Sequence, residues 1–248
     1  MEVHEIILSI IGCLLALLIL IIIIRTLTFK PKKVKIVKKD VEVDEVNGPK
    51  KFSEILKHQT ISYYRNVGTD YKPFQDCIDN LKKNYPNVLS KCEFEQADDY
   101  GICFKLKGKS NEKPSVLMAH YDVVPATEGW EHNPFLGEIV GDSIYGRGAI
   151  DTKCTMACAL RALEKALANN YIPENDLYLC FGSNEEVYGD SQVKIVEEMR
   201  KEGIKPALVF DEGGGITSNA FPGVKEDTAF LGVVEKGMAN VKLSIDGN

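Results

Sequence analysis

Short apolar runs that alternate with helix-like segments constrain the fold of this chain more than any other feature. Residues 115–119, 177–181 and 207–210 each have the length and composition of a buried strand. Segment 152–169, which is rich in Ala and Leu, and segment 192–201 lie between these runs and predict helices. Helices that alternate with apolar strands predict an α/β layer sandwich around a largely parallel central sheet.

Other segments add elements around this centre. In the segment 72–84, the apolar residues Phe74, Cys77, Ile78 and Leu81 recur at the intervals of three and four that are typical of a helix face. The remaining predicted elements are a helix over 52–64, strands over 92–94 and 100–106, a polar loop over 107–114, and a hairpin whose strands are 137–140 and 143–145.

An uncharged run near the N-terminus predicts a membrane span. Residues 6–24 contain no charged side chain and are mostly Ile or Leu. At about 1.5 Å per residue, a helix of this length nearly crosses a hydrocarbon layer of about 30 Å. A cleaved signal peptide would begin with positive charge, whereas Glu2 and Glu5 precede this run. We therefore expect a retained, single-pass anchor.

The residues after the anchor are basic, which bears on its orientation. By the positive-inside rule, a cluster of Lys and Arg on this side favours a cytosolic domain, although a solvated linker or contact with anionic lipid would also explain it. We divide this part into a tail 1–5, an anchor 6–24 and a linker 25–49, with the globular part beginning near residue 50. The basic residues are Arg25, Lys30, Lys32, Lys33, Lys35, Lys38 and Lys39.

Composition excludes some classes of function. The 248 residues are 44% hydrophobic and 27% charged, which is typical of a globular protein with a buried core. The net charge of −6 provides no basic face, so we expect no nucleic-acid partner. The seven cysteines contain no Cys-x-x-Cys pair, and this favours reduced core thiols over a disulfide or a thiolate metal site.

Residues able to bind a metal follow each central strand. In a parallel sheet, strand ends of the same sense meet at one edge, so side chains far apart in sequence can lie close together. One histidine with several carboxylates suits zinc or manganese, and bridging carboxylates suit a pair of metals. The candidates are His120, Asp151, Glu185, Glu186, Asp211 and Glu212.

Neighbouring residues suggest how the work is divided. Glu185 and Glu186 are adjacent and cannot point the same way at an extended strand end, so one can bind metal while the other acts as general base. Asp122 lies two residues after His120 and is placed to accept the second imidazole N–H and fix the tautomer.

Six motifs occur along the chain in order: 120–125 (HYDVVP), Trp130 with Pro134-Phe135, 145–148 (YGRG) with 151–153 (DTK), Glu185-Glu186, 211–214 (DEGG) and 235–237 (EKG). Together they resemble the M20 metallopeptidase family, within it the branch of carboxypeptidase S and the N-fatty-acyl-amino acid synthase/hydrolases. The resemblance extends over residues 50–248.

The resemblance implies a zinc-exopeptidase-like three-layer fold with a two-zinc site. In it His120 and Asp211 hold one zinc, Glu186 holds the other, and Asp151 bridges them. Glu185 is the general base, and Asp122, next to His120, is the second catalytic residue. The peptide bond after Asp151 is often cis in this family. The implied substrates are small amides next to a free carboxylate, namely peptides trimmed from the C-terminus or N-acyl amino acids.

The sequence departs from the family pattern after residue 235. A second metal histidine and the inserted lid domain have no counterpart, and 240–245 resembles only the lid's first strand. We therefore read 50–235 as the N-terminal part of a catalytic domain, 236–248 as the start of a lid through which relatives form homodimers, and the whole as a fragment with an incomplete fold. The other histidines, His4, His58 and His132, are not expected to be ligands.

Two alternative functions remain open: a catalytically inactive, membrane-anchored protein that keeps the sandwich as a binding surface, and an amino-acid deacylase of the same family. The side of the membrane is also open, because members of this branch are often vacuolar, lumenal or secreted.

Overall fold

The computed structural model describes residues 3–30, 44–97, 99–213 and 215–234, together with 237, 241 and 243–245. The chain divides into two units, Met1–Val43 and Asp44–Asn248, and each is described by itself. Several sequence features lie outside the described residues: the lysines between 32 and 39, Gly214 of the DEGG motif, Glu235 and Lys236, and two residues, 240 and 242, of the expected lid strand.

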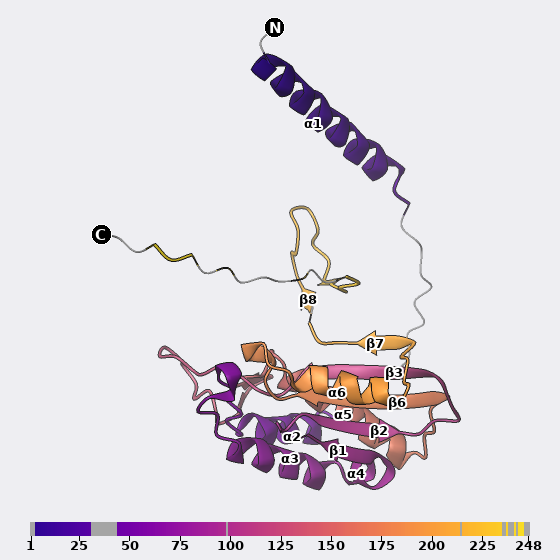
Figure 1. Ribbon diagram of the computed structural model, residues 1–248. Coiled ribbons are helices and arrows are strands. Elements are labelled where there is room, and N and C mark those ends of the chain that lie inside the picture. The colour runs from indigo at the N-terminus through magenta and orange to yellow at the C-terminus, as the bar shows by residue number, and fades with distance from the viewer. Residues whose placement is uncertain are drawn as a thin grey trace. The chain divides into compact units, whose positions relative to one another are not determined.

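In the first unit, the described residues 3–30 form helix α1 (Val3–Thr28), drawn in indigo in Figure 1. It has 26 residues, so at about 1.5 Å per residue it exceeds the thickness of a hydrocarbon layer. Its most apolar window has a mean hydropathy of 3.4, and its side chains are exposed. The predicted span 6–24 lies inside this helix, which is long and apolar enough to cross a membrane. A signal sequence shares these properties.

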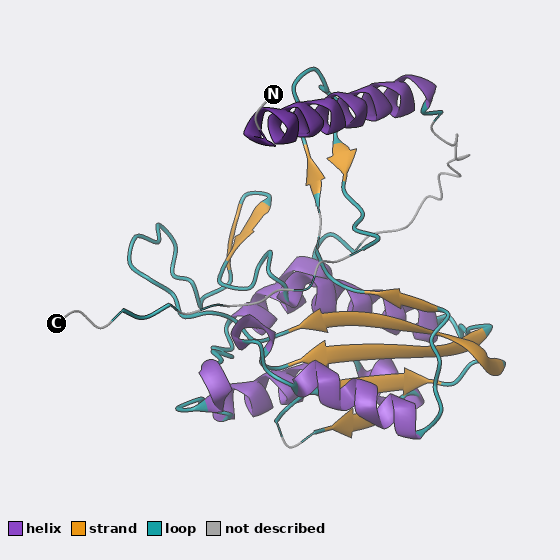
Figure 2. Cartoon of the chain, turned by 45° about the horizontal axis from the view of Figure 1, so that its top comes forward, coloured by secondary structure: helices purple, strands orange, loops and turns teal. Residues whose placement is uncertain are grey.

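The second unit is built on a five-stranded sheet (Figure 2). Strands β3, β6 and β7 pair in parallel, and β2 pairs antiparallel with both β1 and β6. Four of the five strands therefore run in one direction, and the prediction of an α/β fold with a largely parallel sheet is confirmed. In spatial order the strands are β1 (Glu93–Gln96), β2 (Ile102–Leu106), β6 (Asn175–Gly182), β3 (Ser110–His120) and β7 (Leu208–Phe210).

Helices cover both faces of this sheet and make three layers. One face packs against four helices through the larger core, in which Phe74, Leu160 and Phe181 are fully buried. The other face packs Cys180 and Val116 against a single helix. The four helices are α2 (Asn47–Leu56), α3 (Lys72–Asn84), α4 (Pro86–Lys91) and α5 (Lys153–Ala168), and the single helix is α6 (Ser191–Lys201).

The predicted first helix is wrong over residues 57–64. Helix α2 ends at Leu56, and Ile61 instead forms a parallel bridge with Val123. The Val123 N–H donates to the carbonyl of Thr60 at 2.9 Å. This pairing with a distant segment overrides the local helical pattern, because the backbone groups that a helix would use are bonded elsewhere.

Two smaller differences concern the central strand and the peripheral elements. Strand β3 begins at Ser110, so the predicted polar loop 107–114 is partly strand, with a register shift between Ser110 and Ser115. The hairpin is formed as predicted, and further short elements complete the described part: β4 (Glu138–Val140), β5 (Ser143–Tyr145), β8 (Ile216–Thr217), β9 (Thr228–Ala229) and the 3₁₀ turns Tyr64–Asn66 and Glu185–Val187.

Candidate metal centre

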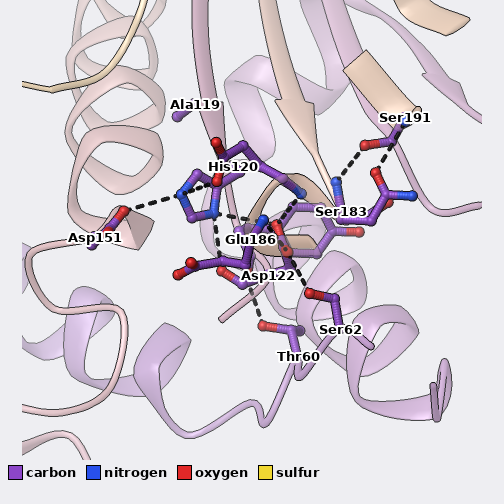
Figure 3. A network of polar contacts seen from close by, with 12 residues as sticks. Thr60, Ser62, Ala119, His120, Asp122, Asp151, Ser183, Glu186 and Ser191 are labelled. Carbon is purple, nitrogen blue, oxygen red and sulfur yellow. Dashed lines mark hydrogen bonds and ion pairs between the residues drawn. The ribbon is translucent and has the colours of Figure 1, made fainter. Parts of the chain in front are cut away.

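The candidate site lies at the carboxyl end of the parallel strands. His120 is the last residue of β3, and the parallel register places it beside Gly182, the last residue of β6. The chain after β6 therefore carries its next residues, including Glu185 and Glu186, into the space in front of the imidazole. Asp151 precedes the first turn of α5 and approaches from the other side (Figure 3).

Three carboxylates converge on one imidazole nitrogen. The Nε2 atom of His120 lies 3.1 Å from Asp151 Oδ1, 3.4 Å from Glu212 Oε1 and 3.5 Å from Glu185 Oε2. His120 itself is 1% exposed. Two overlapping groups of residues each place three donor atoms within 4.8 Å of one another. His120, Asp151 and Glu186 form one group, and His120, Glu185 and Glu212 form the other.

The opposite side of the imidazole fixes its tautomer. Nδ1 lies 3.0 Å from the main-chain oxygen of Asp122 and 3.2 Å from its Oδ1. A carbonyl oxygen only accepts, so Nδ1 carries the proton and donates. The lone pair of neutral His120 is then on Nε2, which faces the carboxylates and is free to bind a cation.

Asp122 also holds the turn that carries the two glutamates. Its carboxylate is fully buried and accepts the main-chain N–H of Glu185 at 3.1 Å and that of Glu186 at 3.2 Å. The Ser62 hydroxyl donates to the same carboxylate at 2.6 Å. One side chain thus links the orientation of His120 to the position of Glu185 and Glu186.

Glu185 and Glu186 lie in a 3₁₀ turn rather than at an extended strand end. The turn still separates them: Glu186 joins the group with Asp151, whereas Glu185 joins the group with Glu212. The Asp151–Thr152 peptide bond is cis, which the resemblance had implied.

Of the two carboxylates after β7, the structure brings Glu212 to the site. Asp211 is exposed and belongs to neither donor group, and its Oδ1 accepts the N–H of Glu212 at 2.9 Å. Glu212 stood among the strand-end candidates, but the resemblance gave the ligand role to Asp211. That role for Asp211 stays a prediction.

The crowding of carboxylates perturbs their protonation. Burial, reinforced by Asp151 and Glu185 and opposed by His120, raises the pKa of Glu212 to about 7. Burial and the neighbouring carboxylates also raise the pKa of Glu185 and of Glu186. These groups retain protons more readily than ordinary carboxyls, and a divalent cation among them would replace those protons. The donor set therefore fits a metal.

The nearby carboxylates also raise the pKa of His120. Burial lowers its pKa, but the hydrogen bond and charge of Asp122, together with Glu212 and Glu185, outweigh this and raise the pKa to about 10. Such a shift marks a strongly negative pocket, which favours a cation in the space that His120 faces.

Two supporting residues lie in the segment that was predicted to be helical. Thr60 donates its hydroxyl to the carbonyl of Tyr121 at 2.5 Å, and Ser62 binds Asp122 as described above. The buried ammonium of Lys153 donates to the carbonyl of His58 at 2.6 Å and secures the start of this segment. Burial lowers the pKa of Lys153 to about 8. No local pattern identifies Thr60 or Ser62, whereas Lys153 was visible as part of the DTK motif.

A three-layer α/β sandwich with one imidazole and several carboxylates at its strand ends is the architecture of a metallohydrolase candidate. The comparisons with known proteins specify it further: the model of peptidase family M20/M25/M40 matches residues 116–242, about half of the chain, and the chain belongs to this family.

Curated relatives agree with this assignment. The chain is 37% identical over 199 residues to the probable carboxypeptidase S-like 1 of Dictyostelium discoideum, which covers 78% of this chain and 41% of that protein. It is 36% identical over 170 residues to the human N-fatty-acyl-amino acid synthase/hydrolase PM20D1, which covers 67% of this chain and 34% of the relative. The chain thus spans well under half the length of these relatives.

Solved structures show the same fold at lower identity. Human carnosine dipeptidase 1 superposes with a TM-score of 0.57 at 17% identity, over 70% of this chain and 40% of that one. The M20 family metallo-carboxypeptidase Sso-CP2 of Sulfolobus solfataricus gives a TM-score of 0.56 at 24% identity, over 71% of this chain and 38% of that one.

Proposed function

We propose that this chain carries part of the catalytic machinery of a metal-dependent amide hydrolase that cleaves a small amide bond next to a free carboxylate. The observation that carries the proposal is the convergence of three carboxylates on His120 Nε2, within 3.1 to 3.5 Å. The printed functions of the relatives, a probable carboxypeptidase and an N-fatty-acyl-amino acid synthase/hydrolase, support the substrate class.

The proposed metal is zinc, in a pair. His120, Asp151, Glu186 and either Asp211 or Glu212 would hold the ions, since one imidazole with several carboxylates is a donor set that zinc accepts. Bound divalent cations would polarise the amide carbonyl and lower the pKa of water.

The chain's own residues would handle the proton. Glu185 would take a proton from the attacking water and deliver it to the leaving amine. Its raised pKa suits this role, because a general base works best when its pKa lies near the operating pH. Asp122 would hold His120 in its Nδ1–H tautomer and fix the turn from which Glu185 projects. The contact with the Glu185 N–H would fix the position of the base, and the contact with Nδ1 would fix the imidazole that the base faces.

Glu185→Gln tests this assignment. The full chain, purified in detergent and loaded with zinc, is assayed with a dipeptide and with an N-acyl amino acid, and bound zinc is measured in parallel. We expect Glu185→Gln to abolish turnover while leaving the zinc content unchanged. The matched control is Glu174→Gln, an exposed residue whose carboxylate pairs with Lys109 on the surface, which should change neither. If the wild type turns over substrate and Glu185→Gln does so at the same rate, Glu185 is not the general base.

The substrate assay also separates the candidate activities. Release of a C-terminal amino acid from the dipeptide alone supports a carboxypeptidase, and release from the acylated amino acid alone supports a deacylase. No observation favours an inactive scaffold, and zinc binding without cleavage of either substrate would support it.

The membrane role of α1 is a further part of the proposal. We propose that residues 6–24 anchor the chain, which predicts that alkaline carbonate leaves it in the membrane pellet with Met1 retained. Loss of the N-terminal peptide would instead indicate a signal sequence. Digestion by protease in sealed vesicles reports on which side of the membrane the domain lies. Homodimer formation through the lid that begins at residue 236 stays a prediction.

A further inference from the structure

Two buried cysteines face each other across neighbouring strands, outside the candidate donor groups. Cys103 on β2 and Cys180 on β6 are direct partners in the antiparallel register. Their Sγ atoms lie 3.2 Å apart. Opposite residues in an antiparallel pair have Cα atoms about 4.5 to 5.5 Å apart, within the roughly 4.4 to 6.8 Å that a disulfide spans. The backbone therefore already has the spacing that a bond between these sulfurs requires.

Among the described residues, a groove lies on the Cys103 side of the pair. Cys103 lines a groove of about 380 Å³ between α6 and the β1, β2 and β6 strands, and its wall includes Tyr178, Lys194 and Met199. Cys103 is 8% exposed, whereas Cys180 behind it is 0% exposed. A small reagent in the groove meets the sulfur of Cys103 first, and Cys180 can react only through Cys103.

We propose that Cys103 and Cys180 form a redox modification site that closes to a cross-strand disulfide when hydrogen peroxide enters the groove. The Cys103 sulfur attacks the peroxide, so that an S–O bond forms, the O–O bond breaks and one water leaves. The Cys180 sulfur then attacks the sulfenic sulfur of Cys103, so that the S–S bond forms and a second water leaves with the Cys180 proton. Two thiols lose two electrons, and one hydrogen peroxide becomes two waters.

The protonation of Cys180 agrees with this order of events. The hydrogen bond with Cys103, followed by burial, raises the pKa of Cys180 well above its ordinary range. A thiol that keeps its proton is a poor first nucleophile, because the thiolate is the reactive form. Burial and the raised pKa both disfavour Cys180 as the first nucleophile, so the more accessible Cys103 meets the oxidant, and Cys180, whose sulfur lies 3.2 Å away, gives up its proton in the second step.

Disulfide mapping of the wild-type chain tests the site. The reduced full chain in detergent is treated with hydrogen peroxide, blocked with N-ethylmaleimide, digested with trypsin and analysed by mass spectrometry. We expect a cross-link between peptides 92–105 and 166–194 that disappears after dithiothreitol. Because Cys92 shares the first peptide with Cys103, the control variant Cys92→Ser should keep the cross-link. Recovery of Cys103 and Cys180 as alkylated free thiols after denaturation, or a bond from Cys180 to Cys92, would overturn the proposal.

Two variants resolve the order of the steps. In Cys180→Ser, we expect Cys103 to stop at the sulfenic acid and to be labelled by dimedone. In Cys103→Ser, Cys180 should remain unlabelled, since it has no access to the groove, and labelling there would contradict the order. If a variant does not fold, the wild-type map still decides whether the disulfide forms.

The stability of the oxidised wild type supplies a readout that needs no variant. The bond would join residues 77 apart in sequence, and closing a loop of that length restricts the unfolded chain. We expect oxidation to raise the Tm by on the order of 10 °C, reversed by dithiothreitol. An unchanged Tm with a confirmed cross-link would show a strained bond and contradict a site that is preformed for oxidation.

Discussion

Replacement of Asp122 by Asn tests whether one buried carboxylate organises the candidate centre. Asn keeps the shape and one acceptor oxygen but replaces the other oxygen by an NH₂ donor. The Ser62 hydroxyl and the Glu186 N–H both donate to Oδ2, at 2.6 and 3.2 Å. If the NH₂ group takes the place of Oδ2, it faces the N–H of Glu186. If it takes the place of Oδ1, it faces the N–H of Glu185 and the Nδ1–H of His120. In either orientation, at least one buried N–H donor loses its acceptor.

The magnitude follows from these contacts. One or two buried donors left without a partner cost about 1 to 3 kcal/mol each, so we expect the free energy of unfolding to fall by about 1 to 6 kcal/mol. Outer hydrogen-bond partners of a metal ligand are typically worth about 10- to 100-fold in metal affinity, and we expect a loss of zinc affinity in that range.

Zinc affinity is measured by competition with a chromogenic chelator, and stability by urea unfolding of the metal-free chain. The matched control is Asp142→Asn, in the exposed turn between β4 and β5, which should change neither quantity. In Ser62→Ala, the partner of Asp122 is removed from the other side. The double variant should lose less than the sum of the single losses, because both changes break the same contact. Zinc affinity of Asp122→Asn within twofold of wild type would show that Asp122 does not organise the candidate centre.

Three further predictions concern residues around the centre. Because the pKa of Glu212 is raised to about 7, its contribution to the stability of the metal-free chain is fully present below about pH 4.5 and is lost as pH rises through 7. Urea unfolding across this window should therefore show a shallower decline for Glu212→Gln, and parallel curves would contradict the assignment. In Gly189→Ala, the new Cβ would overlap the side chain of Asn184, so the turn that carries Glu185 must shift, with an expected loss of about 1 to 3 kcal/mol in unfolding free energy; Gly215→Ala, with open space around it, is the neutral control. Lys153→Met keeps the volume but removes one of the two donors to the carbonyl of His58, which retains the Thr60 N–H at 3.0 Å, and we expect a loss of about 1 to 3 kcal/mol by the same measurement, whereas a more stable variant would show that desolvation of the ammonium outweighs its hydrogen bond.

The sequence predicts the sheet well because its signal is local. The runs that became β3 and β6 are apolar over most of their length and bounded by polar residues, and helix α3 repeats apolar residues at helical intervals. The segment 57–64 fails for the opposite reason. Its conformation is set by pairing of Ile61 with Val123, about sixty residues away, and no local pattern records such a partner.

The candidate site shows the same division. The ends of the predicted strands bring His120, Glu185 and Glu186 to one edge, and Asp151 is placed there by its position just before helix α5. The end of a strand does not distinguish between Asp211 and Glu212, since adjacent side chains diverge according to the backbone after β7. Ser62 could not be found in advance, because its partner Asp122 is 60 residues away in sequence.

The central claim is that the strand ends form a metal centre around His120. Equilibrium dialysis of the full chain against zinc, followed by elemental analysis, measures it directly. We expect zinc to be bound by the wild type and by Glu185→Gln, and to be lost in His120→Ala. A wild-type chain that binds no zinc, or a His120→Ala chain that binds as much as the wild type, would contradict it.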